Sequence, residues 1–216
     1  MEVAIIDYKR SNLFNIVRAL EVVGVKNIRV IPDGKSVLTA DRMILPGVGA
    51  FGDAMKDLKE KELDSIIKEF AQTGKPLLGI CLGMQLLLDS SMEFGEHAGL
   101  GLIPGQVKPL RIFIPDLSTK VPHIGWSELI LEGNSGDSEK HPLAPLLAET
   151  EERSSFYFTH SFVSVPEDPN NTVAKTEYEN QSFCSILKKN NILGCQFHPE
   201  RSGNTGLQFL KNFIFN

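Results

Sequence analysis

Residues 77–88 read LLGICLGMQLLL, and the interpretation of the whole chain starts from this stretch. The apolar run Leu77–Ile80 predicts a buried strand, and Leu82–Leu88 predicts an apolar helix directly after it. Cys81 stands between them in a G-x-C-x-G pattern, which is the nucleophile elbow with sulfur in place of oxygen. The flanking glycines let neighbouring backbone approach without a Cβ clash. The pattern therefore predicts a cysteine nucleophile held above an α/β sheet.

The beginning of the predicted helix favours a reactive thiolate at Cys81, because the helix dipole points its positive end at the sulfur. It also places the backbone N–H of Leu82 where it can donate to an oxyanion. The alternative interpretation of Cys81 is a buried core cysteine, which is what we expect of Cys184 and Cys195 because both lie inside predicted strands.

A candidate base lies in residues 196–200, which read QFHPE at the end of a predicted strand. In an extended chain, residues two apart point the same way, so His198 and Glu200 should share a side. A thiolate nucleophile needs a base, and the base needs a group that orients it. Cys81, His198 and Glu200 together predict a catalytic triad.

Outward from the elbow, the first half of the chain alternates short apolar runs with helical patterns. This alternation, with strands buried on both faces, predicts a parallel sheet with right-handed crossovers. The predicted strands are Val3–Asp7, Ile28–Ile31, Met43–Leu45 and Leu77–Ile80, and the predicted helices are one capped by Ser11 and ended by Gly24 and two within 51–72.

The second half is richer in strands, which are separated by turn residues and followed by a final helix over Thr205–Phe215. We therefore expect an α/β fold: a mostly parallel central sheet flanked by helices, with an added antiparallel layer. Residues 132–140 are polar enough for a loop, but no composition shift divides the chain, so 1–216 is expected to be one domain. The predicted strands are Gln106–Ile114, Leu129–Glu132, Ser155–Val165, Thr172–Thr176, Phe183–Lys188 and Ile192–Phe197.

Composition narrows the class of protein. Lys and Arg number 22 against 27 Asp and Glu, a net charge of −5, which argues against nucleic-acid binding. The beginning of the chain lacks a signal-peptide core, and no apolar stretch is long enough to span a membrane. Three cysteines form neither an even disulfide set nor a metal pair. We expect a cytoplasmic protein with no cofactor and no metal.

Residues 47–52 read GVGAFG and match the GxGxxG pattern of dinucleotide sites. Such a site also needs an acidic residue at the end of the next strand, but Leu77–Ile80 ends in Cys81. A glycine-rich turn with free backbone N–H groups can equally serve a developing oxyanion. The other histidines carry less weight: His97 and His141 are expected at the surface, and His123 and His160 are expected to be structural.

Several stretches together resemble the class I glutamine amidotransferases, and within them the glutaminase subunits of imidazole glycerol phosphate synthases. The resemblance covers nearly the whole chain in order. It rests on PGVGAFG (46–52), GICLGMQLL (79–87), GLGLIPG (99–105), KVPHIGW (120–126), FTHSF (158–162) and GCQFHPE (194–200).

The resemblance implies that L-glutamine is hydrolysed through a thioester and that ammonia passes to a partner (β/α)8-barrel cyclase in a heterodimer of histidine biosynthesis. It implies Cys81 as nucleophile, His198 as acid/base and Glu200 as its orienting group. Leu82, Val48 and Gly49 would supply oxyanion donors. The glutamine would be held by Gln85, Glu93, His160, Ser161 and Phe162.

The chain departs from the family pattern at three places, of which the first two lie near the expected partner or its ammonia path. Residues 7–12 read DYKRSN where a glycine-containing DYGxGN is usual, Ser127 replaces an asparagine, and Phe162 a tyrosine. A paralogous subunit that supplies ammonia for amidination of a bacterial surface sugar is therefore an alternative. Two further alternatives are a nucleotide-binding module that uses the GxGxxG pattern and an inactive assembly scaffold. Titration with NAD would identify a nucleotide-binding module.

Overall fold

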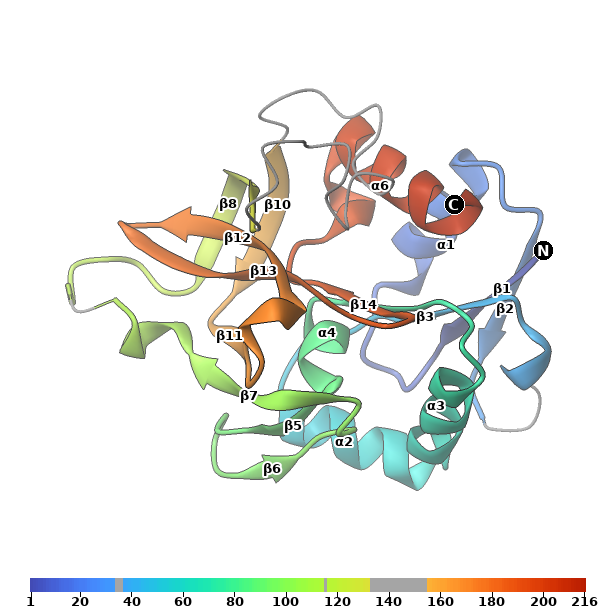
Figure 1. Cartoon of the computed structure of the whole chain (residues 1–216). Coiled ribbons are helices and arrows are strands. Elements are labelled where there is room, and N and C mark those ends of the chain that lie inside the picture. The colour runs from blue at the N-terminus through green and yellow to red at the C-terminus, as the bar shows by residue number, and fades with distance from the viewer. Residues whose placement is uncertain (34–36, 115, 133–154) are drawn as a thin grey trace.

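The computed structural model describes residues 1–33, 37–114, 116–132 and 155–216. A large sheet runs through the middle of the molecule (Figure 1). Neighbouring strands in one part of this sheet pair in parallel, so their carboxyl ends meet at one edge. In spatial order these strands are β2 (Asn27–Ile31), β1 (Glu2–Ile6), β3 (Arg42–Leu45), β4 (Leu77–Ile80) and β14 (Ile192–Cys195).

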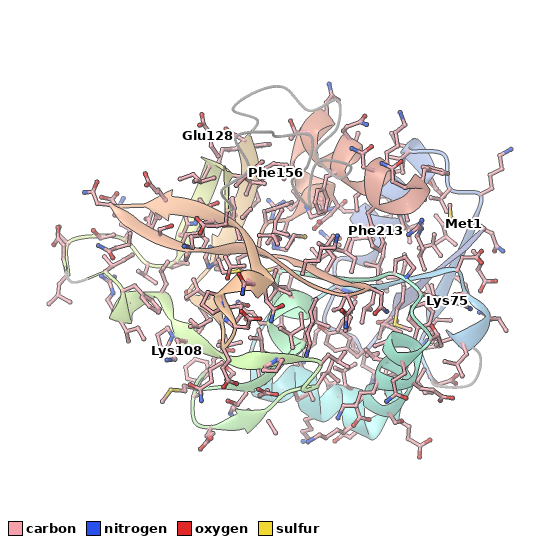
Figure 2. The ribbon with its side chains drawn as sticks, viewed as in Figure 1. Met1, Lys75, Lys108, Glu128, Phe156 and Phe213 are labelled. Atoms are coloured by element: carbon pink, nitrogen blue, oxygen red, sulfur yellow. The ribbon has the colours of Figure 1, made fainter. Side chains whose placement is uncertain are left out.

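Helices cover both faces of this parallel part (Figure 1). Alternate residues of β1 show why: Val3 and Ile5 pack with the helices on one face, and Ala4 and Ile6 with the helices on the other. The first face is covered by α1 (Leu13–Val22) and α6 (Gly203–Phe215), and the second by α2 (Phe51–Glu60), α3 (Leu63–Gln72) and the short α4 (Leu82–Leu86). Figure 2 labels Phe213 of α6, which packs with Val3 and Ile5 on the first face.

An antiparallel layer continues the sheet beyond β14, as expected from the second half of the sequence. β13 (Gln181–Lys189) pairs antiparallel with β14, β12 (Thr172–Tyr178) and β11 (Phe162–Pro166). Further strands are β7 (Ile103–Pro109), β5 (Leu88–Ser91), β6 (His97–Ala98) and β9 (Ile130–Leu131), and a separate two-stranded sheet joins β8 (His123–Glu128) to β10 (Ser155–His160). The predicted fold class is confirmed.

Several boundaries differ from the predicted ones, and in three cases long-range pairing overrides local pattern. The predicted helix Leu82–Leu88 ends at Leu86, since Leu88 pairs with Ile103 in the sheet. The predicted strand Ser155–Val165 is two strands in different sheets, because the His160 side chain bonds the Phe162 carbonyl across a bend.

The predicted strand Gln106–Ile114 stops at Pro109, after which the chain turns into a 3-10 helix over Leu110–Ile112. The N–H of Leu110 donates to the Ser161 carbonyl at 2.8 Å, which turns the chain at that point.

Two smaller expectations also change. Ser11 does not cap the first helix: Asn12 is its N-cap residue, and the Ser11 hydroxyl is buried without a hydrogen-bond partner in the described part of the chain. The polar loop expected at 132–140 and the surface position expected for His141 fall almost entirely outside the described residues. Among the helices that are described, none is long and apolar enough to cross a membrane.

Candidate active site

Cys81 occupies the turn between β4 and α4 in a conformation, φ 54° and ψ −110°, that side chains rarely adopt. Its N–H donates to the Cys195 carbonyl at 2.8 Å, which ties the turn to β14. A Cβ on Gly83 would lie 1.8 Å from the Leu45 carbonyl oxygen, and one on Gly79 would lie 2.7 Å from the Gly83 oxygen. Both glycines are therefore required by close backbone approach, as the elbow pattern predicts.

His198 and Glu200 come together as the alternation argument predicts, but through different backbone. Glu200 lies in a 3-10 helix, Pro199–Arg201, rather than in extended chain, and its Oε1 lies 2.9 Å from His198 Nδ1. Both side chains are almost fully buried. Glu200 therefore fixes one ring nitrogen and leaves Nε2 directed away from it.

The electrostatics around His198 favour its charged form. Burial alone would favour the neutral ring, but the charge of the nearby Cys81 sulfur, together with the hydrogen bond and charge of Glu200, raises the pKa of His198. Cys184 and Cys195 differ: both are buried, and burial raises the pKa of Cys184 to about 12 and that of Cys195 well above its usual value. The expectation that these two cysteines are core residues is confirmed.

Cys81 and His198 open on a cavity of about 320 Å³. Of the residues that sequence reasoning selected, Glu200 lies behind His198 and the others line this cavity. The lining consists of Val48, Gly49, Cys81, Leu82, Gln85, Glu93, Pro122, Thr159, His160, Ser161, Phe162 and His198.

The glycine-rich turn over 46–52 packs against the elbow. A Cβ on Gly47 would lie 2.2 Å from the Tyr8 hydroxyl oxygen and 2.9 Å from the Leu82 Cβ. The N–H of Val48 donates to the Arg10 carbonyl at 2.9 Å, so it points away from the cavity. Gly49, at φ 97°, adopts a conformation that favours glycine.

The last glycine of the GxGxxG pattern has a packing reason of its own. A Cβ on Gly52, in the first turn of α2, would lie 2.6 Å from the imidazole of His97. His97 is half-buried at this contact rather than lying freely at the surface as expected. Close packing therefore accounts for this glycine of the pattern without a dinucleotide.

Gln85 and Glu93 are both buried, although neither position is apolar in sequence. The Gln85 amide Nε2 donates to the Phe162 carbonyl at 3.0 Å and to Gln196 Oε1 at 3.1 Å. Glu93 accepts the N–H of Phe51 at 2.6 Å, which caps α2, and burial raises the pKa of its carboxyl group. Glu93 therefore places a carboxyl group in the cavity wall.

The two histidines expected to be structural form a buried chain. His160 Nδ1 donates to the Phe162 carbonyl at 2.9 Å, so its Nε2 accepts from His123 Nδ1 at 3.2 Å. His123 Nε2 then accepts from the Ser127 hydroxyl at 3.0 Å. Burial lowers the pKa of His123 to about 4 and that of His160 to about 3, so both rings are neutral at pH 7.

Sequence reasoning missed three residues of this site. Gln196 Nε2 lies 3.7 Å from Cys81 Sγ, and Pro122 and Thr159 line the cavity. Gln196 stands two residues before His198, so the same alternation that linked His198 to Glu200 pointed to it. Pro122 and Thr159 carry no chemical signal in the sequence.

Comparison with known proteins matches the chain to a family. The sequence model of the family described as "Glutamine amidotransferase class-I" matches residues 4–216. Imidazole glycerol phosphate synthase subunit HisH of Lacticaseibacillus casei (strain BL23) is 47% identical over 212 residues, which cover 98% of this chain and 94% of that relative. Subunit HisH of Aquifex aeolicus (strain VF5) is 43% identical over 213 residues, with 99% and 96% covered. Subunit HisH 1 of Legionella pneumophila (strain Lens) is 42% identical over 213 residues, with 98% of each covered.

Solved structures agree on the fold. "Structure of PurLQS from Thermotoga maritima" superposes with a TM-score of 0.72 at 21% identity, covering 99% of this chain and 97% of that chain.

Proposed function

The chain belongs to the class-I glutamine amidotransferase family, and from that membership we propose that it is the glutaminase subunit of an imidazole glycerol phosphate synthase. It would hydrolyse L-glutamine to glutamate and ammonia and pass the ammonia to a cyclase subunit, in histidine biosynthesis in the cytoplasm. Relatives that bear this subunit name at 42–47% identity support the assignment over the sugar-amidating alternative. The match over 4–216 also supports one catalytic domain.

One observation carries the chemistry: a strained cysteine at a strand-to-helix turn shares a cavity with a buried histidine backed by a carboxylate. In the proposed reaction, the Cys81 thiolate attacks the glutamine carboxamide carbon. His198, as the imidazolium, gives its proton to the departing ammonia, which leaves a thioester on Cys81. His198 then takes a proton from water as the water attacks the thioester, and glutamate leaves as the Cys81 sulfur returns to the thiolate.

Two backbone donors are proposed to stabilise the oxyanion of each tetrahedral intermediate. The N–H of Leu82 begins α4 beside the sulfur. The second donor belongs to the Val48–Gly49 turn, where the Val48 N–H now bonds the Arg10 carbonyl. Rotation of a peptide there would aim a second N–H into the cavity, and glycine permits that rotation.

The remaining cavity residues are proposed to hold the two charged groups at the α-carbon of glutamine. The buried carboxylate of Glu93 suits the α-ammonium group, with Gln85 beside it. The backbone of His160, Ser161 and Phe162 forms the opposite wall. The chain of neutral histidines keeps this wall rigid without adding charge.

We propose a (β/α)8-barrel cyclase as the heterodimer partner, docked at the mouth of this cavity. Pro122 lines the cavity, and the exposed side chains of Ile124 and Trp126 follow on β8. Exposed large apolar side chains beside a site favour a protein interface.

The proposal is tested by covalent labelling. A diazo-ketone analogue of glutamine should modify Cys81 in the wild-type chain bound to its cyclase, and mass spectrometry locates the adduct. A Cys184→Ala variant is the matched control and should label like the wild type. Labelling confined to Cys184 or Cys195 would overturn the assignment of the nucleophile.

A second assay separates the two half-reactions. A complex of Cys81→Ala with the cyclase should lose product formation from glutamine yet retain it from ammonium salt, because the acceptor chemistry resides on the partner. Failure with both nitrogen sources, despite an intact complex, would contradict the proposed division of labour.

A further inference from the structure

Gln196 is fully buried between the end of β14 and His198, and the catalytic scheme above gives it no task. Its backbone N–H donates to the Ser185 carbonyl at 2.8 Å, which fixes the residue to β13. Its side-chain Nε2 lies 3.7 Å from Cys81 Sγ, within the range of an N–H···S hydrogen bond. We propose that Gln196 is a further catalytic residue, whose amide N–H stabilises the Cys81 thiolate and positions its sulfur. This deepens the proposed function because it concerns the same nucleophile.

The orientation of this amide decides whether it helps or harms a thiolate, because its nitrogen donates and its oxygen accepts. The surrounding hydrogen bonds determine that orientation. The Phe162 carbonyl is the fixed point, because a carbonyl oxygen can only accept a hydrogen bond. Gln85 must therefore turn its Nε2 to that carbonyl, and the same nitrogen donates to Gln196 Oε1 at 3.1 Å. With Oε1 engaged by Gln85, the Gln196 N–H faces the sulfur.

Reversing either amide breaks this pattern. If Gln196 were turned over, its NH₂ would face the NH₂ of Gln85, and its oxygen would face the sulfur. If Gln85 were turned over as well, its oxygen would face the Phe162 carbonyl oxygen. Each reversal sets like against like in a buried site, where an unsatisfied polar group destabilises the arrangement.

A donor at this place suits both halves of the proposed reaction. A hydrogen bond to the charged form of a group favours that form, so the N–H increases the fraction of thiolate before attack. When the thioester is hydrolysed the sulfur leaves again as a thiolate, and the same N–H stabilises it. The Gln196 amide does this without giving or taking a proton.

Three other titratable groups act on the sulfur and must be considered in any test. His198 approaches from the segment that follows Gln196. The Tyr8 hydroxyl lies under the elbow, and Cys195 lies on the neighbouring strand β14. Burial raises the pKa of Tyr8 and of Cys195, so both stay neutral through the range of the experiment. The buried Glu200 lies behind His198, and both side chains are unchanged in the variants below.

The experiment measures the rate of Cys81 alkylation by iodoacetamide from about pH 5 to pH 10, with mass spectrometry to assign the modified cysteine. Gln196→Leu removes both polar ends at similar volume, while Gln85 keeps its bond to Phe162. We expect the midpoint of the rate curve to move up by about one pH unit, which is about tenfold less thiolate on the rising part of the curve. Gln196→Glu should move the midpoint further, because a carboxylate would face the sulfur.

Gln72→Leu, on the exposed end of α3, is the matched control and should follow the wild-type curve. Thermal unfolding and ammonia-dependent synthesis in the complex check that each variant is folded. Gln196→Glu keeps the shape of the native side chain and carries the test if the leucine variant does not fold. Alkylation needs no glutamine, so this test does not depend on glutaminase activity. Absence of that activity would refute the proposed function, while the alkylation midpoints would still test the role of Gln196. Wild-type midpoints in both variants would overturn the role of Gln196.

Discussion

At the scale of single residues, the site depends on one strained position. Cys81 lies in a region of φ and ψ that costs of order 1–3 kcal/mol for a side-chain-bearing residue. The strain is held by the bond from its N–H to Cys195 and by backbone packed against Gly83. The conformation matters because it raises the sulfur above the sheet edge and into the cavity.

The substitution Gly83→Ala should therefore destabilise the fold severely. Its new Cβ would lie 1.8 Å from the Leu45 carbonyl oxygen, so α4 must shift and the elbow must distort. We expect a loss of at least about 3 kcal/mol in urea unfolding, at the upper end of overpacking effects. Gly52→Ala is the matched control, because its Cβ would meet the His97 ring, which can rotate away. Equal effects of the two substitutions would contradict this account.

A second residue-scale prediction separates the roles of His198 and Glu200. His198→Ala removes the group that moves the proton and should lower glutaminase kcat in the complex by about 10²–10⁴-fold. Glu200→Gln keeps an acceptor oxygen near Nδ1 and should cost less. Glu177→Gln, exposed on β12, serves as the control. Near wild-type turnover by His198→Ala would require another base.

At the scale of elements, the two-stranded sheet of β8 and β10 holds two neutral histidines, one on each strand. His123 and His160 stand opposite each other in register, and the His123 ring stacks on Phe158 at 5.1 Å between centroids. Tyr178 closes the cage at 4.3 Å from the His123 ring. A proton on either ring would break the donor order from Ser127 to the Phe162 carbonyl.

This pair should make stability depend on pH. Folding lowers both pKa values from about 6.5, to about 4 for His123 and about 3 for His160. The unfolded chain therefore binds more protons below pH 6.5. The contribution of this pair to the free energy of unfolding is thus complete above pH 6.5 and falls as the pH drops toward 4, by at most about 1.4 kcal/mol per pH unit for each histidine.

Urea unfolding at several pH values tests this dependence. His123→Phe keeps an aromatic ring in the cage and removes one titration, so its stability should fall less steeply between pH 6.5 and pH 4. Tyr178→Phe removes only the hydroxyl bonded to the Lys120 carbonyl and should keep the wild-type slope. A wild-type slope in His123→Phe would show that this histidine does not cause the pH dependence of stability.

At the scale of the whole molecule, the cavity forms where the carboxyl ends of β4 and β14 meet the antiparallel layer. The parallel part supplies the nucleophile and the turn over 46–52, and the segment joining β10 to β11 supplies the opposite wall. Figure 1 shows the parallel part and the antiparallel layer side by side in one continuous sheet. A partner that contacts both β8 and the turn could therefore adjust the site.

We expect the isolated chain to be a weak glutaminase. The Val48 N–H is engaged by the Arg10 carbonyl, and loss of one oxyanion donor costs about 10²–10³-fold in rate. Adding the cyclase subunit should raise kcat by a similar factor, measured as glutamate release. His198→Ala in the same complex is the control and should not be rescued. Full activity of the chain alone would show that the resting turn already supplies both donors.

Local spacing was enough to predict the elements that depend on neighbours along the chain. The elbow at Cys81 follows from glycines at fixed offsets. The closeness of His198 and Glu200 was also predicted, but from an extended chain, whereas the structure achieves it through a 3-10 helix. The alternation of apolar runs likewise predicts the parallel part of the sheet, because buried strands between helices have few other arrangements. The catalytic roles themselves stay predictions.

Tertiary structure decided everything that depends on which segments meet. Sequence pattern does not show that residues 155–165 change sheets at Ser161, because both parts have the same periodicity. Nor does it show that the Val48 N–H is engaged by Arg10, or that Gln196 presents its nitrogen to the sulfur. These outcomes depend on hydrogen bonds between groups far apart in the chain. Only the packed molecule determines which donor finds which acceptor, because each buried polar group must be paired.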